Sequence, residues 1–125
     1  MLGQKNALAT VAVKDLEVAR KFYEGTLGLK VAGPTGPEVL TFESGSSKIL
    51  VYKSQFAGTN QATAVTWPVG GEVDAIVRDL KAKGVTFENY DFPNVTHEGD
   101  VHVFGRMRNA WFKDPDGNIL SVVNG

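Results

Sequence analysis

The order of predicted secondary structure repeats once along the chain, and this repeat constrains the fold more than any other feature. Residues from about 7 to 53 read as a strand, a helix and three strands, and residues from about 62 to 123 read in the same order. Each module is too small to bury a good core alone, so the two must pack together. The sequence therefore predicts an α+β fold with two βαβββ modules in a single domain, residues 1–125.

The first module begins with a β-branched, alternating segment at 8–13, which is typical of a strand. Asp15 is a good N-cap for the helix that follows, because its carboxylate can accept from the free amides of the first turn. Apolar residues then recur at helical spacing from Leu16 to Leu27, and Gly28 ends the helix. Turns at 33–37 and 44–47 separate the three expected strands, which are 29–32, 39–43 and 48–53.

The second module repeats these signals after a segment, 54–61, that reads as a linker or loop. Its helix is indicated by Val73, Ile76, Val77 and Leu80 at i, i+3, i+4 and i+7, and it ends at Gly84. We expect a polar loop at 89–99 and a turn at 114–118. The expected strands are 63–67, 85–88, a long one from 101 to 113 and 119–123.

The charge and the composition exclude several classes of function. The chain has 13 Lys and Arg against 14 Asp and Glu, so its net charge of -1 gives no reason to expect nucleic acid or an anionic membrane as a partner. It has no cysteine and two histidines, which argues against disulfides, thiolate chemistry and imidazole-rich metal sites. Neither a secretory signal nor an apolar run of ~20 residues is present, which favours a cytoplasmic location.

Three segments carry a resemblance to a known family. They are Val13-Lys-Asp-Leu-Glu-Val-Ala-Arg-Lys-Phe-Tyr23 with Leu27-Gly28, Val73-Asp-Ala followed by Leu80-Lys-Ala-Lys-Gly-Val85, and Phe112-Lys-Asp-Pro-Asp-Gly-Asn118. In this order they resemble the vicinal oxygen chelate superfamily, which includes glyoxalases, bleomycin-resistance proteins and extradiol dioxygenases. The resemblance implies a cup-shaped mixed sheet, usually completed as a homodimer.

The resemblance also implies where metal ligands would stand, on strands that face into the cup. Those positions fall here on Leu8, near Ala64, on Ser121 and around 51–53, where only Tyr52 offers an oxygen. Leu and Ala cannot coordinate a metal, and a neutral Ser or Tyr is a poor ligand beside imidazole or carboxylate. We therefore expect no metal and no other cofactor in the cup.

Two polar groups of residues leave alternatives open. The loop before Val103 holds His97, Glu98, Asp100 and His102. These could form a relocated metal site or an acid–base pair, or they could be an ordinary solvated loop. Arg106 and Arg108 would share one face of an extended chain, where they could grip an anion or serve as surface arginines and dimer salt bridges.

Aromatic residues outside the helices give the functional expectation. Phe56, Tyr90, Phe92 and Phe104 lie in or beside predicted loops, so they either line the cup or join the core. The leading hypothesis is a metal-free protein that binds a small aromatic or drug-like molecule, like the drug-sequestering members of the superfamily. No catalytic residue is assigned, and the expected ligand-binding residues are Thr10, Tyr52, Phe56, His102, Arg108, Trp111 and Ser121.

Two alternatives remain open beside this hypothesis. One is a lyase, isomerase or dioxygenase-like enzyme of the same superfamily that works without metal or with unusual ligands. In that case the reaction would rely on His102, Arg108 or Tyr52. The other is a structural or regulatory protein whose cup is vestigial.

Overall fold

The computed structural model describes the backbone of residues 1–125 and every side chain except that of Pro34. The chain divides into two compact units, Met1–Thr59 and Asn60–Gly125, and each is described by itself. The boundary lies inside the segment 54–61 that the sequence indicates as a linker or loop.

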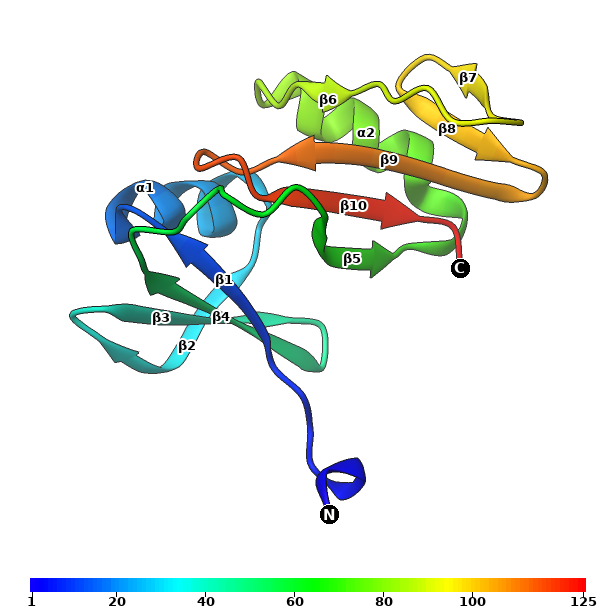
Figure 1. Ribbon diagram of the computed structural model, residues 1–125. Coiled ribbons are helices and arrows are strands. Elements are labelled where there is room, and N and C mark those ends of the chain that lie inside the picture. Colours follow the sequence, from blue (N-terminus) through cyan, green and yellow to red (C-terminus); the bar gives the residue numbers. More distant parts are fainter. The chain divides into compact units, whose positions relative to one another are not determined.

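The first unit has the βαβββ order. After a short helical turn, η1 (Leu2–Gln4), come β1 (Ala9–Val13), α1 (Leu16–Arg20), the helical continuation η2 (Lys21–Thr26), β2 (Lys30–Gly36), β3 (Val39–Ser44) and β4 (Ser47–Lys53). The sheet order is β1-β4-β3-β2, with β1 and β4 parallel and the other pairs antiparallel. Figure 1 shows α1 beside this sheet. Its core contains Val11, Val13, Tyr23, Phe42 and Val51.

The helix cap of the first unit forms as predicted, and the prediction of one turn is wrong. Asp15 caps α1, because its Oδ1 accepts from the backbone N–H groups of Glu17 and Val18 at 2.8 and 3.2 Å. The helix runs on to Thr26 but winds as a π-helix over its last six residues. Strand β2 continues to Gly36, through most of the turn expected at 33–37, because pairing with β3 resumes at Gly36 after an irregularity.

The second unit contains β5 (Thr63–Pro68), η3 (Gly70–Glu72), α2 (Val73–Ala82), β6 (Phe87–Glu88), β7 (Thr96–Glu98), β8 (Val101–Phe104), β9 (Met107–Lys113) and β10 (Ile119–Val123). The strand order is β5-β10-β9-β8-β7, and β6 also pairs with β9. Strands β6 and β8 both pair with the same edge of β9. Strand β6 pairs near the C-terminal end of β9, and β8 pairs near its N-terminal end. The loop predicted at 89–99 is partly wrong, because backbone pairing with β8 makes its end a strand, β7.

The two faces of this second sheet differ in what covers them. Helix α2 packs against β9 and buries Val73, Val77 and Leu80 (Figure 1). Because side chains alternate along a strand, Ala110 and Phe112 lie on the face toward α2, which we call the helix face. Trp111 and Asn109 lie on the opposite face, which we call the far face, and the candidate site is built there.

Candidate ligand-binding site

Six rings gather on the far face of the second unit. This ring cluster consists of Tyr90, Phe92, His97, His102, Phe104 and Trp111. The ring centroid of Trp111 lies 4.9 Å from that of His102, 5.4 Å from that of Tyr90 and 5.8 Å from that of Phe92. These are normal separations for attractive ring pairs, so the cluster forms a continuous aromatic surface.

Strand register brings the cluster together. His102 of β8 is opposite Asn109 of β9 on one side and opposite His97 of β7 on the other. Phe104 and Trp111 lie two residues from this row, so alternation places them on the same face. Tyr90 and Phe92 come from residues 89–95, between β6 and β7, which cross this face. His102 is therefore a buried strand residue, in agreement with the strand predicted from 101, and the alternative that made it part of an ordinary solvated loop is wrong.

His102 is the polar centre of the cluster. Its side chain is completely buried, and its Nε2 accepts a hydrogen bond from the backbone N–H of Tyr90 at 2.9 Å. Because Nε2 acts as the acceptor, the proton of the neutral ring sits on Nδ1. Burial lowers the pKa of His102, and the neighbouring His97 lowers it further. The imidazole is thus neutral at pH 7.

This lowered pKa predicts a pH dependence of stability. The unfolded chain takes up a proton on His102 near the ordinary value of 6.5, whereas the folded chain takes it up only at lower pH. Below pH 6.5 the unfolded state then holds more protons, so the free energy of unfolding falls with falling pH. We expect urea denaturation to show this fall in the parent and to lose most of it in His102→Gln.

His97→Gln is the matched control for this titration. It removes an exposed imidazole one strand away, and it leaves the larger cause of the shift, the burial of His102, in place. We expect this variant to keep most of the pH dependence. An equal loss of the slope in His97→Gln and His102→Gln would contradict the assignment.

Three buried polar atoms of the site make no hydrogen bond among the described residues. They are the Tyr90 hydroxyl, His102 Nδ1 and Asn109 Oδ1. Burial raises the pKa of Tyr90, and the carboxylate of Glu88 raises it further, so the phenol keeps its proton. A buried polar atom without a partner is costly, which makes such atoms good anchors for a polar ligand group. Asn109 was missed as a site residue, although its spacing of two from Trp111 could have indicated it, whereas Tyr90 was expected only as a ring that either lines the cup or joins the core.

Ser121 and Trp111 are neighbours on adjacent strands. Ser121 of β10 is opposite Trp111 of β9 and is 1% exposed. Its Oγ lies 2.9 Å from the hydroxyl oxygen of Thr66, while Trp111 donates its indole N–H to the hydroxyl of Thr63 at 3.1 Å. The structure therefore brings together three of the expected ligand-binding residues, namely His102, Trp111 and Ser121.

Arg108 faces away from these residues. It lies on the helix face, where its guanidinium donates to the carboxylates of Glu98 and Asp74, with the shortest distance to each 2.9 Å. Both bonds raise the pKa of Arg108, and the bond to Glu98 has the larger effect. Arg106 is exposed in the turn between β8 and β9. The pairs join β9 to β7 and α2, so Arg108 holds the unit together rather than lining the ring cluster.

The other three expected residues belong to the first unit. Thr10 is exposed and donates its hydroxyl to the carbonyl of Leu8 at 3.1 Å. Tyr52 is opposite Ala12 and is 39% exposed, so it lies on the same sheet face as Thr10. Phe56 is 66% exposed in the turn after β4. In this unit the described contacts do not gather these side chains into one cluster.

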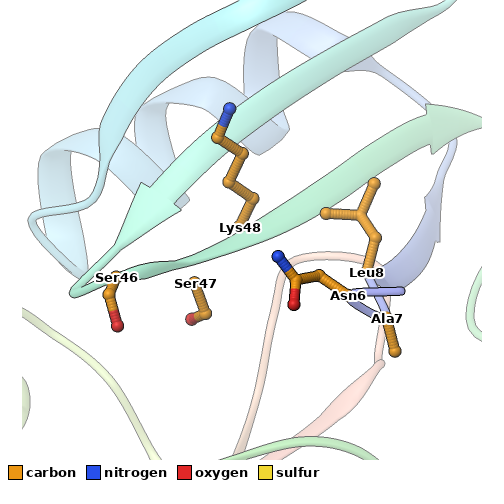
Figure 2. Close-up of a pocket in the computed structure, with 6 residues that line it drawn as sticks. All are labelled: Asn6, Ala7, Leu8, Ser46, Ser47 and Lys48. Carbon is orange, nitrogen blue, oxygen red and sulfur yellow. The ribbon is translucent and has the colours of Figure 1, made fainter. Parts of the chain in front are cut away.

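An open groove of about 510 Å³ lies at the start of β4. Figure 2 shows Lys48 and Asn6 beside Leu8, with Ala7, Ser46 and Ser47 along the rest of the lining. The side chain of Leu8 stands where the resemblance would put a first metal ligand, and its isobutyl group has no donor atom. The polar atoms that line the groove are the hydroxyls, the amide and the ammonium of exposed residues.

The residues present do not fit a transition metal. Ala64 falls at an irregularity of the β5–β10 pairing, and Ser121 is engaged with Thr66. Near His102, Asp100 accepts from Lys81 at 2.7 Å, and this bond above all lowers the pKa of that carboxyl. In the part of the chain that the structure describes, no three His, Cys, Asp or Glu side chains are grouped as a metal site requires.

Comparison with known proteins gives one family and many similar folds. The family described as "Glyoxalase/Bleomycin resistance protein/Dioxygenase superfamily" matches residues 6–122. Fosfomycin resistance protein FosX from Listeria monocytogenes, in its hexagonal form, has a TM-score of 0.73 at 18% identity, over 98% of this chain and 93% of that one. Lactoylglutathione lyase from Agrobacterium tumefaciens has a TM-score of 0.69 at 19% identity, over 97% and 94%.

A third similar structure is the integron cassette protein HFX_CASS4, from the mobile metagenome of the Halifax Harbour sewage outfall. Its TM-score is 0.71 at 17% identity, and the match covers 97% of this chain and 99% of that one. At these identities the likeness concerns the fold.

Among the helices that the structure describes, none has the length and apolar character needed to cross a membrane.

Proposed function

Since the chain belongs to the glyoxalase/bleomycin resistance protein/dioxygenase superfamily, we propose that it binds a small planar aromatic molecule without a metal ion. The ligand would lie on the far face of the second unit, stacked on Trp111 beside His102. The observation that carries this proposal is the combination of continuous rings with three buried polar atoms that have no partner among the described residues. Apolar surface with a few convergent polar groups is typical of small-molecule sites.

The chemistry of the donors supports the metal-free part of the proposal. The chelating enzymes that the sequence resembles use His or Glu ligands, whereas Leu8, Ala64, Tyr52 and Ser121 stand at those positions here. Without strong donors a transition metal would remain with water. Ring stacking, apolar burial and hydrogen bonds are the forces that this site offers.

An enzyme of the same superfamily, a lyase, isomerase or dioxygenase-like protein, is the second candidate. His102 is the group that favours it, because a neutral histidine at pH 7 is a good general base. Its Nε2, however, accepts from the N–H of Tyr90, and its Nδ1 carries the proton, so the ring offers no free lone pair to a substrate in this structure. Capture without turnover is therefore the better supported function.

Fluorescence of Trp111 tests the binding proposal. The chain has two tryptophans, so Trp67→Phe leaves Trp111 as the single reporter on the far face, and Trp111→Phe leaves Trp67 on the helix face. We expect planar aromatic compounds to quench the Trp67→Phe protein with saturation. Because Trp67 lies away from the site, binding to Trp111→Phe is measured by ligand-observed NMR titration, and we expect it to be about 10-fold weaker, a loss of about 1.4 kcal/mol.

The outcomes separate the two candidate functions. Saturable quenching with no product after long incubation supports capture. Product formation that is lost in His102→Gln would instead support the enzyme. A stoichiometric transition metal that survives dialysis would contradict the metal-free part, and the absence of saturable quenching at Trp111 would contradict the site itself.

A further inference from the structure

The segment 89–95, which we call the strap, crosses the ring cluster between β6 and β7. It makes two kinds of contact with the far face. Its backbone N–H at Tyr90 donates to His102 Nε2 at 2.9 Å. Its rings lie against the cluster, with Tyr90 5.4 Å and Phe92 5.8 Å from Trp111, and Phe92 also 5.8 Å from Phe104. The strap thus brings one hydrogen-bond donor and two rings to the face.

The strap is weakly held at its centre. Its four residues from 91 to 94 are all exposed, and Phe92 keeps 43% of its surface in solvent although it contacts the cluster. Asn94 has a φ of 61°, in the left-handed region that asparagine adopts more readily than most other residues, as is typical of an exposed turn. The buried Tyr90 hydroxyl has no partner among the described residues. Segments with such features open at a small free-energy cost.

We infer that the strap occupies the position where the ligand binds. The ligand would then supply the hydrogen-bond donor and the ring that the strap provides in this structure. A molecule that displaces the strap leaves His102 Nε2 without a donor unless it brings one. It also uncovers the face of Trp111 unless it brings a ring. The fitting class is therefore a planar aromatic molecule with an N–H or O–H donor at its ring edge, such as an indole or a naphthol.

This inference rests on the proposed function and gives it a chemical selectivity. The donor of the ligand and the N–H of Tyr90 compete for one acceptor, because Nε2 has a single lone pair. The strap itself therefore lowers the affinity of the site, since part of the binding energy is used to displace it. Weakening the strap should tighten binding, and removing the acceptor should abolish the preference for a donor.

Matched probe pairs test the selectivity. Indole is compared with 1-methylindole, and 2-naphthol with 2-methoxynaphthalene, by ligand-observed NMR titration of the full chain at pH 7.5. We expect the parent to bind the member with the donor about 10-fold more tightly, as one buried hydrogen bond of about 1.4 kcal/mol requires. In His102→Phe the ratio should fall to about 1, while His102→Gln, which keeps an oxygen acceptor, should retain part of it.

Phe92→Ala tests the competition. It removes a strap ring that is 43% exposed, so the fold should survive, and both members of each pair should bind about 3-fold to 10-fold more tightly. Circular dichroism checks that every variant is folded. Weaker binding in Phe92→Ala, or an unchanged ratio in folded His102→Phe, would overturn the inference while leaving aromatic binding intact. If none of the probes binds either the parent or Phe92→Ala, the proposed function itself fails.

Discussion

Replacing Phe112 with alanine is expected to lower the free energy of unfolding by about 3–5 kcal/mol. Phe112 is 1% exposed near the C-terminal end of β9, opposite Phe87 of β6 and Leu120 of β10, and its ring lies 5.4 Å from that of Phe87. Truncation would remove buried apolar surface where three strands meet, and the rigid sheet could not close the cavity. Urea denaturation followed by circular dichroism measures the loss.

Phe56→Ala is the matched control, because it makes the same chemical change at a side chain that is 66% exposed. We expect its free energy of unfolding to stay within about 0.5 kcal/mol of the parent. Similar losses in the two variants would mean that Phe112 is not the buried core residue described here.

Replacing Asp114 with alanine is expected to cost about 2–4 kcal/mol of stability, because buried donors are left without an acceptor. The side chain is 4% exposed. Its Oδ1 accepts from the backbone N–H groups of Asp116 and Asn118, both at 2.9 Å, and its Oδ2 accepts from the side-chain amide of Asn118 at 2.8 Å. These bonds shape the turn that aligns β9 with β10.

Asp114→Asn separates the backbone hydrogen bonds from the charge, since an amide oxygen in the place of Oδ1 still accepts from both backbone donors, whereas the bond from the Asn118 amide to Oδ2 is lost. We expect it to lose less stability than Asp114→Ala. Asp91→Ala, at an exposed position of the strap, controls for the loss of an aspartate and should change stability by less than about 0.5 kcal/mol. If Asp114→Ala also lowered the free energy of unfolding by less than about 0.5 kcal/mol, the structural role assigned to this turn would be contradicted.

The features that local physics decides were predictable from the sequence. Asp15 caps its helix because a carboxylate before free amides acts within three residues. The β9–β10 turn forms because Asp114, Pro115 and Gly117 supply the acceptor, the fixed φ and the positive φ of 92° that it needs. Such signals depend only on residues that are near in sequence, so they can be recognised without the structure. The segments that contain them carried the resemblance to the family.

The features that distant pairing decides were not predictable in the same way. Strand β7 has little strand signal of its own, and it forms because β8 offers it backbone partners. Strand β2 runs through glycine and proline because β3 lies beside it. The strap could be expected to be a loop, but its position over Trp111 follows from the hydrogen bond between Tyr90 and His102.

For the candidate site, the sequence by itself determined that metal-binding side chains are scarce. Two histidines, no cysteine and the residues Leu8, Ala64 and Ser121 at the ligand positions of the resembled family all argue against a metal. It also supplied the aromatic side chains. Composition and motif spacing are properties of the chain alone, so they hold whatever the packing.

Only the tertiary structure decided which of those side chains meet. Register across β7, β8 and β9 buries His102 among the rings, and alternation turns Arg108 to the other face, toward Asp74 and Glu98. Contacts of this kind join residues that are far apart in sequence, and a shift of one residue in register would exchange the two faces. The place of a side chain in the site therefore depends on strand pairing that no single segment specifies.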